Sequence, residues 1–211
     1  MIPKLHYIAQ GSSPKDYLEN IQNACTSGIE LIQLGIPKLV DKKFLKLAQE
    51  AREITSHFQT RLIIEDRYKV AKEIKADGVL MTNPNSYSTL RKSLHTWQMM
   101  AGKANTLQDC EFLLSKEVDY IILGPYKAPQ EGEGDHTILG VNGFTAIIDA
   151  LKTETPIIGS GNILIDDVKD ILAAGISGIA VAEEITGDFN RIRTYNQLLN
   201  ASVTEEQRHS F

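Results

Sequence analysis

One feature of the sequence restricts the fold more than any other: a short apolar segment that recurs and ends in small or polar residues. It occurs at 76–81, 117–125, 155–159 and 176–182. Between these segments, apolar residues recur at helical spacing. Brief apolar strands that alternate with helices are typical of a parallel sheet buried on both faces. Because such folds carry their chemistry where the strands end, we expect functional residues at those ends.

The pattern predicts eight strands, each followed by a helix. The strands are expected at 5–9, 29–34, 61–65, 78–81, 97–101, 120–123, 156–158 and 178–182. The helices are expected at 15–26, 41–58, 67–75, 86–94, 106–116, 144–151, 165–174 and 190–200. Eight such units in 211 residues predict an α/β protein, a (β/α)8 TIM barrel, with a doubly wound open sheet as the alternative. We expect a single domain over residues 1–200 and a polar tail at 201–211.

The composition narrows the class of function. The net charge is −5, and acidic and basic residues are interspersed, with no basic patch that would favour a nucleic-acid partner. No apolar run approaches the length of a membrane span. Cys25 and Cys110 lack metal-ligand spacing and suggest no disulfide framework, which fits a reduced cytoplasm. We therefore expect a cytoplasmic monomer or homodimer that acts on a small molecule, without nucleic-acid or membrane partners.

Six segments, distributed between about Leu5 and Ile185, resemble those of the thiamine phosphate synthase family and its tautomerase relative TenI. They are Ile32–Leu34, Ile63–Asp66, Lys75–Val79, Val118–Pro125, Thr155–Ile158 and Gly175–Val181. These segments mainly build the barrel, so the resemblance implies the fold more strongly than the activity. The family's synthases join a pyrimidine pyrophosphate to a thiazole phosphate with magnesium. That reaction needs cations and amide donors for the phosphates and carboxylates for the metal.

The resemblance also implies which positions should carry that reaction, and most of them are replaced. In the Gln-x-Arg-x-Lys motif after the second strand, Gln33 remains, but Gly35 and Pro37 stand in place of the two cations. The Asn-Asp pair after the third strand becomes Glu65–Asp66, which leaves Asp66 as a magnesium carboxylate. Asn85 stands where the second metal carboxylate would fall, and of the Gly-Gly pair after the seventh strand Gly161 remains while Asn162 replaces the second glycine. The other replaced positions are Leu80–Asn83, Lys103, Asn105, Pro129–Gly132 and Ala182–Glu184.

These replacements change the charge expected at the mouth of the barrel. Acidic residues stand where phosphates should lie, and a carboxylate within a few ångströms of a phosphate costs on the order of 1–4 kcal/mol. Each lost cation removes a charge-assisted hydrogen bond of roughly 1.5–3 kcal/mol. Both effects argue against efficient thiamine phosphate synthesis, and the mouth becomes a more apolar cup. The residues expected to contact substrate are Gln33, Leu80, Met81, Met99, Pro129, Gly161 and Ala182.

Ionisable groups in an apolar cavity have shifted pKa values, and four of them are candidate catalytic residues: Glu65, Lys103, Tyr126 and Glu183. A carboxylate there is suited to taking a proton from carbon, and a desolvated lysine to attacking a carbonyl, as in retro-aldol cleavage. We therefore expect a lyase-type enzyme for a small apolar or aromatic substrate, with no cofactor.

Four of the site residues also have a purely structural interpretation: Lys103, Glu65, Asp66 and Tyr126. The alternatives for Lys103 are an ammonium that points into solvent at the rim of the barrel and an ion pair with a nearby glutamate. Glu65 has the alternative of a surface or paired carboxylate. Asp66 has the alternative of capping the helix expected to begin at Arg67. Tyr126 has the alternative of anchoring a loop.

Two origins explain an intact frame with an altered mouth: a natural paralogue that lost its ancestral activity, or a family barrel whose pocket was deliberately engineered. We favour the engineered pocket. Three other functions stay open. They are a retained thiamine phosphate synthase (a transferase with Mg²⁺ on Asp66), a barrel that only binds a ligand, and a scaffold without function. The long glycine-bearing loop at 126–139 is expected to be an active-site lid.

Overall fold

The computed structural model describes residues 1–83, 87–128 and 137–199, and within them parallel strands close into a barrel. The strands are β1 (Leu5–Ile8), β2 (Leu31–Leu34), β3 (Arg61–Glu65), β4 (Gly78–Met81), β5 (Met99–Ala104), β6 (Tyr120–Leu123), β7 (Ile157–Ser160) and β8 (Gly178–Val181). Each strand pairs with its neighbours in the sequence, and β8 closes the ring on β1. The predicted single-domain TIM barrel is confirmed, and the open sheet is wrong.

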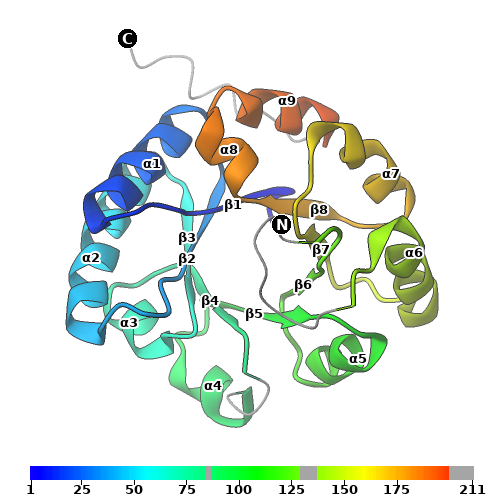
Figure 1. Cartoon of the computed structure of the whole chain (residues 1–211). Coiled ribbons are helices and arrows are strands. Elements are labelled where there is room, and N and C mark those ends of the chain that lie inside the picture. Colours follow the sequence, from blue (N-terminus) through cyan, green and yellow to red (C-terminus); the bar gives the residue numbers. More distant parts are fainter. Residues whose placement is uncertain (84–86, 129–136, 200–211) are drawn as a thin grey trace.

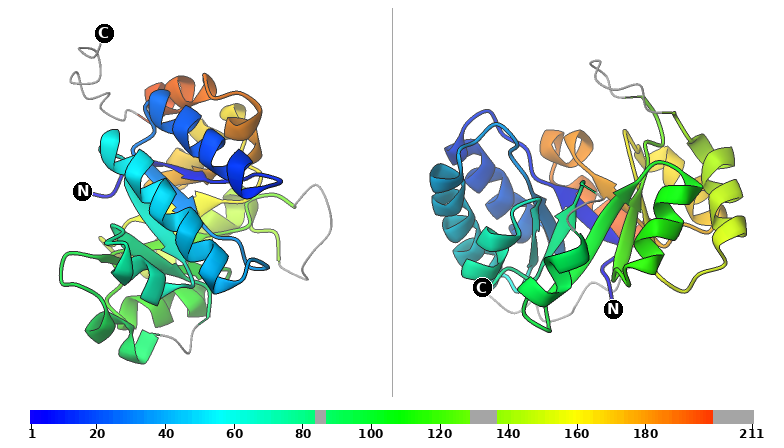
Figure 2. Two further views of the ribbon diagram at one scale, coloured as in Figure 1. Left: turned by 90° about the vertical axis from the view of Figure 1, so that its left-hand side faces the viewer. Right: turned by 90° about the horizontal axis from the view of Figure 1, so that it is seen from below.

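Helices form an outer ring around the strands, as Figures 1 and 2 show. Within the described residues they are α1 (Pro14–Thr26), α2 (Asp41–His57), α3 (Tyr68–Glu73), α4 (Tyr87–Ser93), α5 (Leu107–Ser115), α6 (Gly140–Leu151), α7 (Val168–Ala173), α8 (Glu183–Gly187) and α9 (Arg191–Leu198). A short 3-10 turn at Ile165–Asp167 leads into α7. Among the described residues, no helix is both long and apolar enough to cross a membrane.

Side chains of the strands alternate between the inside of the barrel and the helix layer, as a closed sheet requires. The inside holds a separate apolar cluster: Leu31, Ile63, Leu80, Ala101, Tyr120, Ile122, Ile158 and Ala180. The residues between these positions pack outward against the helices, in a larger cluster that runs around the barrel. The strand ends are thus fixed from both sides, which gives the loops at the mouth a rigid base.

Three side chains repeat one role at the end of the barrel where the strands begin. Asp77, Asp119 and Ser177 directly precede β4, β6 and β8. Each accepts a hydrogen bond from a backbone N–H of the preceding strand, at 2.8, 2.7 and 3.3 Å, from Leu62, Met100 and Ile157 respectively. The two aspartates also pair with arginines of the helix layer, Arg52 and Arg91. Polar side chains at this end therefore hold the strands in register.

The fifth strand is the main element that the sequence misplaces. The sequence predicts it at 97–101, but β5 spans Met99–Ala104. Gln98 holds the turn before it, because its side-chain amide donates to two backbone carbonyls at 3.0 and 2.8 Å. Trp97 therefore lies in a turn, 53% exposed and stacked on His95, instead of beginning a strand.

The last part of the chain also differs from the prediction. The sequence gives no helix directly after the eighth strand, but α8 begins two residues beyond β8, and the helix expected at 190–200 is α9. Its last predicted residue and the polar tail at 201–211 lie outside the described residues.

Candidate functional site

An ion pair joins the carboxyl ends of β3 and β5 at the mouth of the barrel. Lys103 Nζ donates to Glu65 Oε1 at 2.6 Å. The Glu65 side chain is 18% exposed and that of Lys103 41%, so the carboxylate is shielded while the ammonium remains open to solvent. Of the two structural alternatives for Lys103, exposure to solvent or an ion pair with a glutamate, the structure shows the ion pair. The candidate catalytic residues Glu65 and Lys103 therefore lie together, and each is bound to the other.

Glu65 also lies against Gly35, just beyond the end of β2. A Cβ atom at position 35 would lie 2.7 Å from Glu65 Oε2 and 2.8 Å from Glu65 Cβ, which is closer than such atoms pack. A cavity of about 210 Å³ opens here, lined by Gly35, Ile36, Pro37, Glu65, Asp66 and Arg67. The glycine that replaces a cation of the family motif therefore makes room for the carboxylate.

Arg67 forms a fixed wall of this cavity. Its Nε donates to Asp41 Oδ1 at 3.0 Å, and its Nη2 donates to the carbonyl oxygen of Leu39 at 2.7 Å. The guanidinium carbon lies 4.3 Å from the centre of the Phe44 ring. Because these contacts hold the guanidinium against the segment after β2, Arg67 stabilises the shape of the mouth.

Asp66 links the ends of two neighbouring strands. Its Oδ1 accepts the backbone N–H of Thr82 at 2.8 Å, and its Oδ2 accepts the Thr82 hydroxyl at 2.6 Å. Its φ of +57° lies in the left-handed region, which aspartate tolerates better than most residues. The alternative that Asp66 caps the following helix is wrong, because α3 has no side-chain cap and its N-cap position is Arg67.

Asp66 is also the described residue best suited to binding Mg²⁺. Mg²⁺ keeps several waters and is usually held by one or two carboxylates together with substrate phosphates. Asp66 is exposed, and a carboxylate offers about four lone-pair sites, so the two bonds from Thr82 leave acceptor capacity. Among the described residues, no group of three His, Cys, Asp or Glu could hold a metal unaided. Asn85, the second metal position implied by the resemblance, lies outside them.

Gln33 is buried inside the barrel in a polar chain that the sequence did not reveal. Gln33 Nε2 lies 3.0 Å from His6 Nδ1, and His6 Nε2 lies 3.0 Å from the carbonyl oxygen of Pro3. A carbonyl only accepts, so the His6 proton is on Nε2, and Nδ1 accepts from Gln33. Burial lowers the pKa of His6 to about 3, which keeps the ring neutral. Gln33 is therefore oriented with its amide nitrogen toward His6 and its Oε1 as the remaining acceptor.

The segments after β6 and β7 are tied together at the other side of the mouth. Lys127 Nζ donates to both carboxylate oxygens of Asp167, at 2.8 and 2.6 Å, and its backbone N–H donates to the carbonyl of Gly161 at 3.1 Å. Gly161 has a φ of +103°, and a Cβ there would lie 2.7 Å from Pro125 Cα. Only glycine fits this close approach, in a region where TIM barrels often bind phosphate groups.

Tyr126 is held by packing. Its side chain is 7% exposed, and its ring centre lies 5.6 Å from that of Phe144. Burial, followed by the nearby charge of Asp167, raises its pKa. A buried phenol with a raised pKa suits the anchoring of a loop, the alternative to a general acid. The loop's residues 129–136, which include Pro129, lie outside the described residues, so the expected lid stays a prediction.

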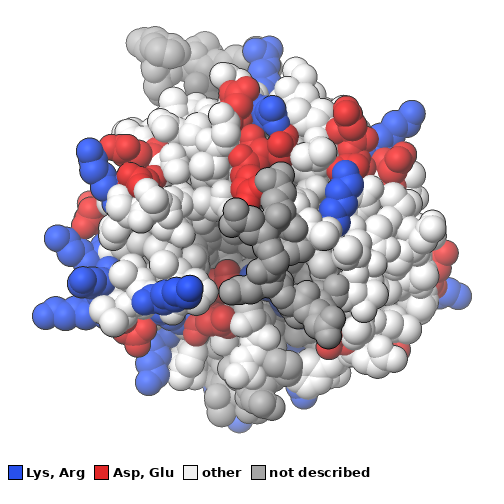
Figure 3. Space-filling view, in the orientation of Figure 1, with Lys and Arg blue, Asp and Glu red and all other residues white. Residues whose placement is uncertain are grey.

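Acidic side chains gather where α8 begins. Ala182 is half-buried at the N-cap of α8, Glu183 is exposed, and Glu184 pairs with Arg191. Figure 3, in the orientation of Figure 1, shows acidic groups near the middle of this face and most basic groups toward its edge. Ala182 and Glu183 thus lie directly after β8, at the mouth, as the sequence predicts. Neither side chain is a cation that could bind a phosphate.

Two of the expected substrate contacts point elsewhere. Met81 is 3% exposed and packs between the sheet and the helices, because it follows Leu80, which faces the inside of the barrel. Met99 begins β5 and therefore lies at the end where the strands start, opposite the mouth. Leu80 itself is fully buried. Neither methionine therefore contributes to the apolar cup that the sequence predicts at the mouth.

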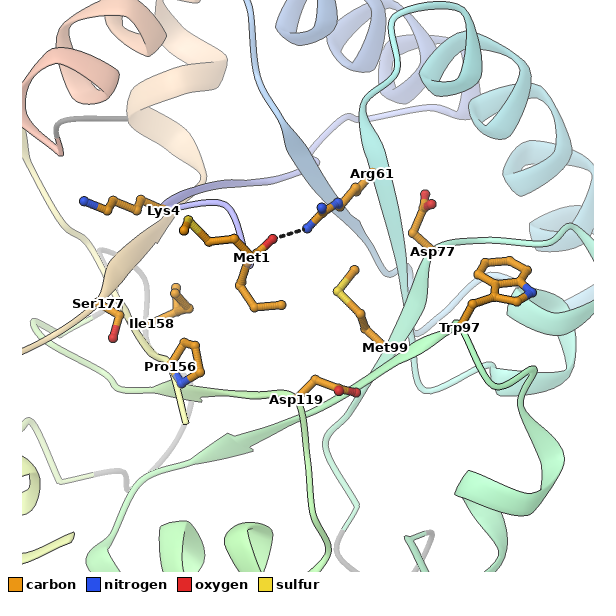
Figure 4. Close-up of a pocket in the computed structure, with 11 residues that line it drawn as sticks. Met1, Lys4, Arg61, Asp77, Trp97, Met99, Asp119, Pro156, Ile158 and Ser177 are labelled. Atoms are coloured by element: carbon orange, nitrogen blue, oxygen red, sulfur yellow. Dashed lines mark hydrogen bonds between the residues drawn. The ribbon is translucent and has the colours of Figure 1, made fainter. Parts of the chain in front are cut away.

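A larger cavity, of about 570 Å³, lies at that opposite end and was not expected from the sequence. Figure 4 shows Met1 in the middle of the residues around it. They are Met1, Ile2, Lys4, Arg61, Asp77, Trp97, Met99, Asp119, Pro156, Ile158 and Ser177. Its charged groups bind the protein itself: Arg61 Nη1 donates to the Met1 carbonyl at 2.6 Å, and Lys4 Nζ to that of Leu199 at 2.9 Å.

The chain is thus a TIM-barrel protein. Its Glu65–Lys103 ion pair and the candidate metal ligand Asp66 lie at the carboxyl ends of the strands. The sequence matches a family model described as "Thiamine monophosphate synthase" over residues 5–185. The chain belongs to the thiamine monophosphate synthase family, which confirms the resemblance stated from the sequence.

Known relatives are similar over almost their whole length. The chain is 31% identical to a protein of Flavobacterium johnsoniae named thiamine-phosphate synthase, over 96% of this chain and 99% of that protein. It is 32% identical to the Flavobacterium psychrophilum protein of the same name, over 94% and 98%. The fold matches that of a thiamine phosphate pyrophosphorylase from Pyrococcus furiosus, with a TM-score of 0.79, 21% identity and coverage of 97% and 96%.

These findings correct the function expected from the sequence. Lyase-type chemistry by a free carboxylate base or a lysine amine in an engineered pocket is wrong, because full-length relatives carry the synthase name and the family model covers most of the chain. The retained synthase, kept open as an alternative, fits them better. The structure agrees with this correction in one respect, because the Lys103 ammonium offsets the charge of the Glu65 carboxylate, a pairing that the sequence had left open.

Proposed function

We propose that the chain is a thiamine-phosphate synthase, a transferase that joins a pyrimidine pyrophosphate to a thiazole phosphate and releases pyrophosphate. The observation that carries the proposal is the similarity to proteins of that name over 96% and 94% of this chain. The cytoplasmic location and the monomeric or homodimeric state remain predictions that accompany it.

The described residues give this function a consistent set of roles. Asp66 would hold Mg²⁺, which when bound neutralises charge on the pyrophosphate leaving group. Lys103 has three N–H donors and gives one to Glu65, so the others are available to an anionic oxygen at the mouth. Gly161 and the backbone around it support a phosphate site after β7 and β8. Gln33 offers its Oε1 from inside the barrel.

The test is the reaction itself. The purified chain is incubated with both phosphorylated precursors and Mg²⁺, and thiamine phosphate and pyrophosphate are quantified separately. We expect equal amounts of the two products and their loss after chelation of the metal. The Lys15→Ala variant, which alters only an exposed i,i+4 pair with Glu19, is the matched control and should keep the full rate. Pyrophosphate release without thiamine phosphate would contradict the proposal.

A further inference from the structure

The larger cavity, at the end of the barrel where the strands begin, has the features of a second binding site. Its volume of about 570 Å³ lies within the range of roughly 300–1,000 Å³ that is typical of small-molecule pockets. We propose that it binds an amphipathic monocarboxylate, whose apolar chain lies against the interior of the barrel and whose carboxylate pairs with Arg61. The inference goes beyond the proposed function and does not rest on it.

The apolar side chains of this cavity continue the interior of the barrel. Ile158 belongs to the apolar cluster inside the barrel, and Ile2 and Met99 pack against that cluster while they line the cavity. Trp97 adds an aromatic wall that is 53% exposed. Because an unbranched methionine adapts to irregular shapes, Met99 can follow the outline of a flexible chain. An apolar chain that enters here leaves water, which is the main source of affinity for such a ligand.

Arg61 places a cation at the same opening. It lies two residues before Ile63 on β3, so its side chain faces the same way, toward the inside of the barrel. Among the described residues, its guanidinium donates one hydrogen bond, to the Met1 carbonyl at 2.6 Å, and its other N–H groups are available. Burial raises the pKa of the neighbouring Glu30 and the charge of Arg61 lowers it, although no ion pair joins these two described residues. A carboxylate is the group that matches a planar guanidinium.

The other charged groups of the lining favour a ligand with a single negative charge. The two aspartates of the lining already pair with arginines of the helix layer. Lys4 donates to the Leu199 carbonyl, and Figure 4 shows its ammonium turned away from the other labelled residues. Within the described lining, Arg61 is thus the cation that a ligand can reach. One guanidinium matches one carboxylate, whereas the several charges of a pyrophosphate would lack partners.

The position of the tryptophan makes the proposal directly testable. Trp97 is the single tryptophan of the sequence, so its fluorescence reports on this cavity. The full chain is titrated with hexanoate, octanoate and 1-octanol, and calorimetry measures the same affinities independently. We expect octanoate to bind about tenfold more tightly than hexanoate, because each buried CH₂ group strengthens binding roughly fourfold. 1-Octanol has the same chain without the charge and should bind roughly tenfold more weakly than octanoate.

Variants of Arg61 separate the effect of charge from that of shape. Arg61→Gln should weaken octanoate roughly ten- to hundredfold and leave 1-octanol within about twofold, since it removes only the charged donor. Arg61→Lys keeps the charge and should bind octanoate more tightly than Arg61→Gln. Arg193→Gln, which removes an exposed arginine of α9 that does not line the cavity, is the matched control and should bind like the original chain. Melting curves identify any variant that fails to fold.

The outcomes that contradict the proposal are specific to this cavity. Equal affinities for octanoate and 1-octanol, unchanged octanoate binding by a folded Arg61→Gln protein, or the absence of both heat and a fluorescence change would each overturn it. In an NMR titration octanoate should shift the amides of Trp97 and Met99, and shifts confined to Gly35 and Asp66, at the mouth, would overturn it as well. Because none of these measurements follows thiamine phosphate formation, their failure is distinguishable from failure of the proposed function.

Discussion

The two ends of the barrel use similar side chains for different purposes. At the end where the strands begin, the cavity is about 570 Å³, and its aspartates accept backbone N–H groups of neighbouring strands. At the mouth the cavity is about 210 Å³, and Glu65 bonds to another side chain, Lys103, beside an open glycine. The larger cavity is thus lined by groups that hold the sheet, whereas at the smaller one the exposed Asp66 keeps acceptor capacity for a ligand. The bonds that polar groups already make are a better guide to function than cavity size.

Removing the metal carboxylate at the mouth should have the largest effect. Asp66→Asn keeps the shape of the side chain, and asparagine tolerates the left-handed backbone at this position. It removes a charged ligand whose metal contributes several kcal/mol to the reaction, so thiamine phosphate formation should fall by roughly 100-fold or more. The measurement is the initial rate at saturating Mg²⁺, with a melting curve as the check on folding. An undiminished rate would exclude this role for Asp66.

The corresponding change at the opposite end should affect stability and spare activity. Asp77→Ala removes the acceptor of the Leu62 N–H and of Arg52, so the free energy of unfolding should fall by about 2–3 kcal/mol. Urea unfolding measures this loss, and the rate should stay within about twofold of the original. Asp77→Asn is the milder control, because its amide oxygen can still accept the Leu62 N–H. If Asp77→Ala abolished activity in a stable protein, the division between the two ends would fail.

His6 lies between the two ends and should make stability depend on pH. Its pKa is about 3 in the folded chain against an ordinary value of 6.5, so below pH 6.5 the unfolded chain binds the proton first. The stabilisation is present above pH 6.5 and is lost as the pH falls toward 3. Between pH 7 and pH 5, His6 should lower the free energy of unfolding by about 2 kcal/mol. Urea unfolding at pH 7 and pH 5 measures the drop in the free energy of unfolding for the original chain and for His6→Gln. The drop should be about 2 kcal/mol smaller in His6→Gln. Equal drops in the two proteins would contradict a lowered pKa of His6.

The smallest effect is expected on the outer surface, away from both ends. Lys15 and Glu19 form an exposed i,i+4 pair on α1, with side chains 82% and 60% exposed. Such pairs contribute about 0.3–0.5 kcal/mol, so Lys15→Ala should change the free energy of unfolding by no more than this. A larger loss in urea unfolding would show that the charged surface, and not only the barrel ends, determines stability.

Most of the fold could be predicted from the sequence because it depends on local periodicity. Apolar runs and helical spacing place β3, β4 and β6 at their observed bounds. The fifth strand is misplaced because Trp97 is apolar, although Gln98 holds it in a turn through carbonyls far away in the sequence. That two-residue shift alone moves Met99 from the expected mouth to the opposite end.

The site was harder to predict because its parts are distant in sequence. Glu65 and Lys103 are 38 positions apart, and only the barrel's closure brings them to one ion pair. Gly35 was counted as a lost cation, although its lack of a side chain is what accommodates Glu65. Strand ends could thus be identified as the place of function, but the charge balance there depends on contacts between strands that no local pattern records.

The most direct test of the difference between the two ends is to observe which one responds to substrate. Amide chemical shifts of the full chain are recorded before and after addition of pyrimidine pyrophosphate with Mg²⁺. The account predicts shifts at Gly35, Asp66 and Lys103, with the amides of Asp77, Trp97 and Met99 unchanged. Shifts confined to Asp77, Trp97 and Met99, in the larger cavity, would contradict it.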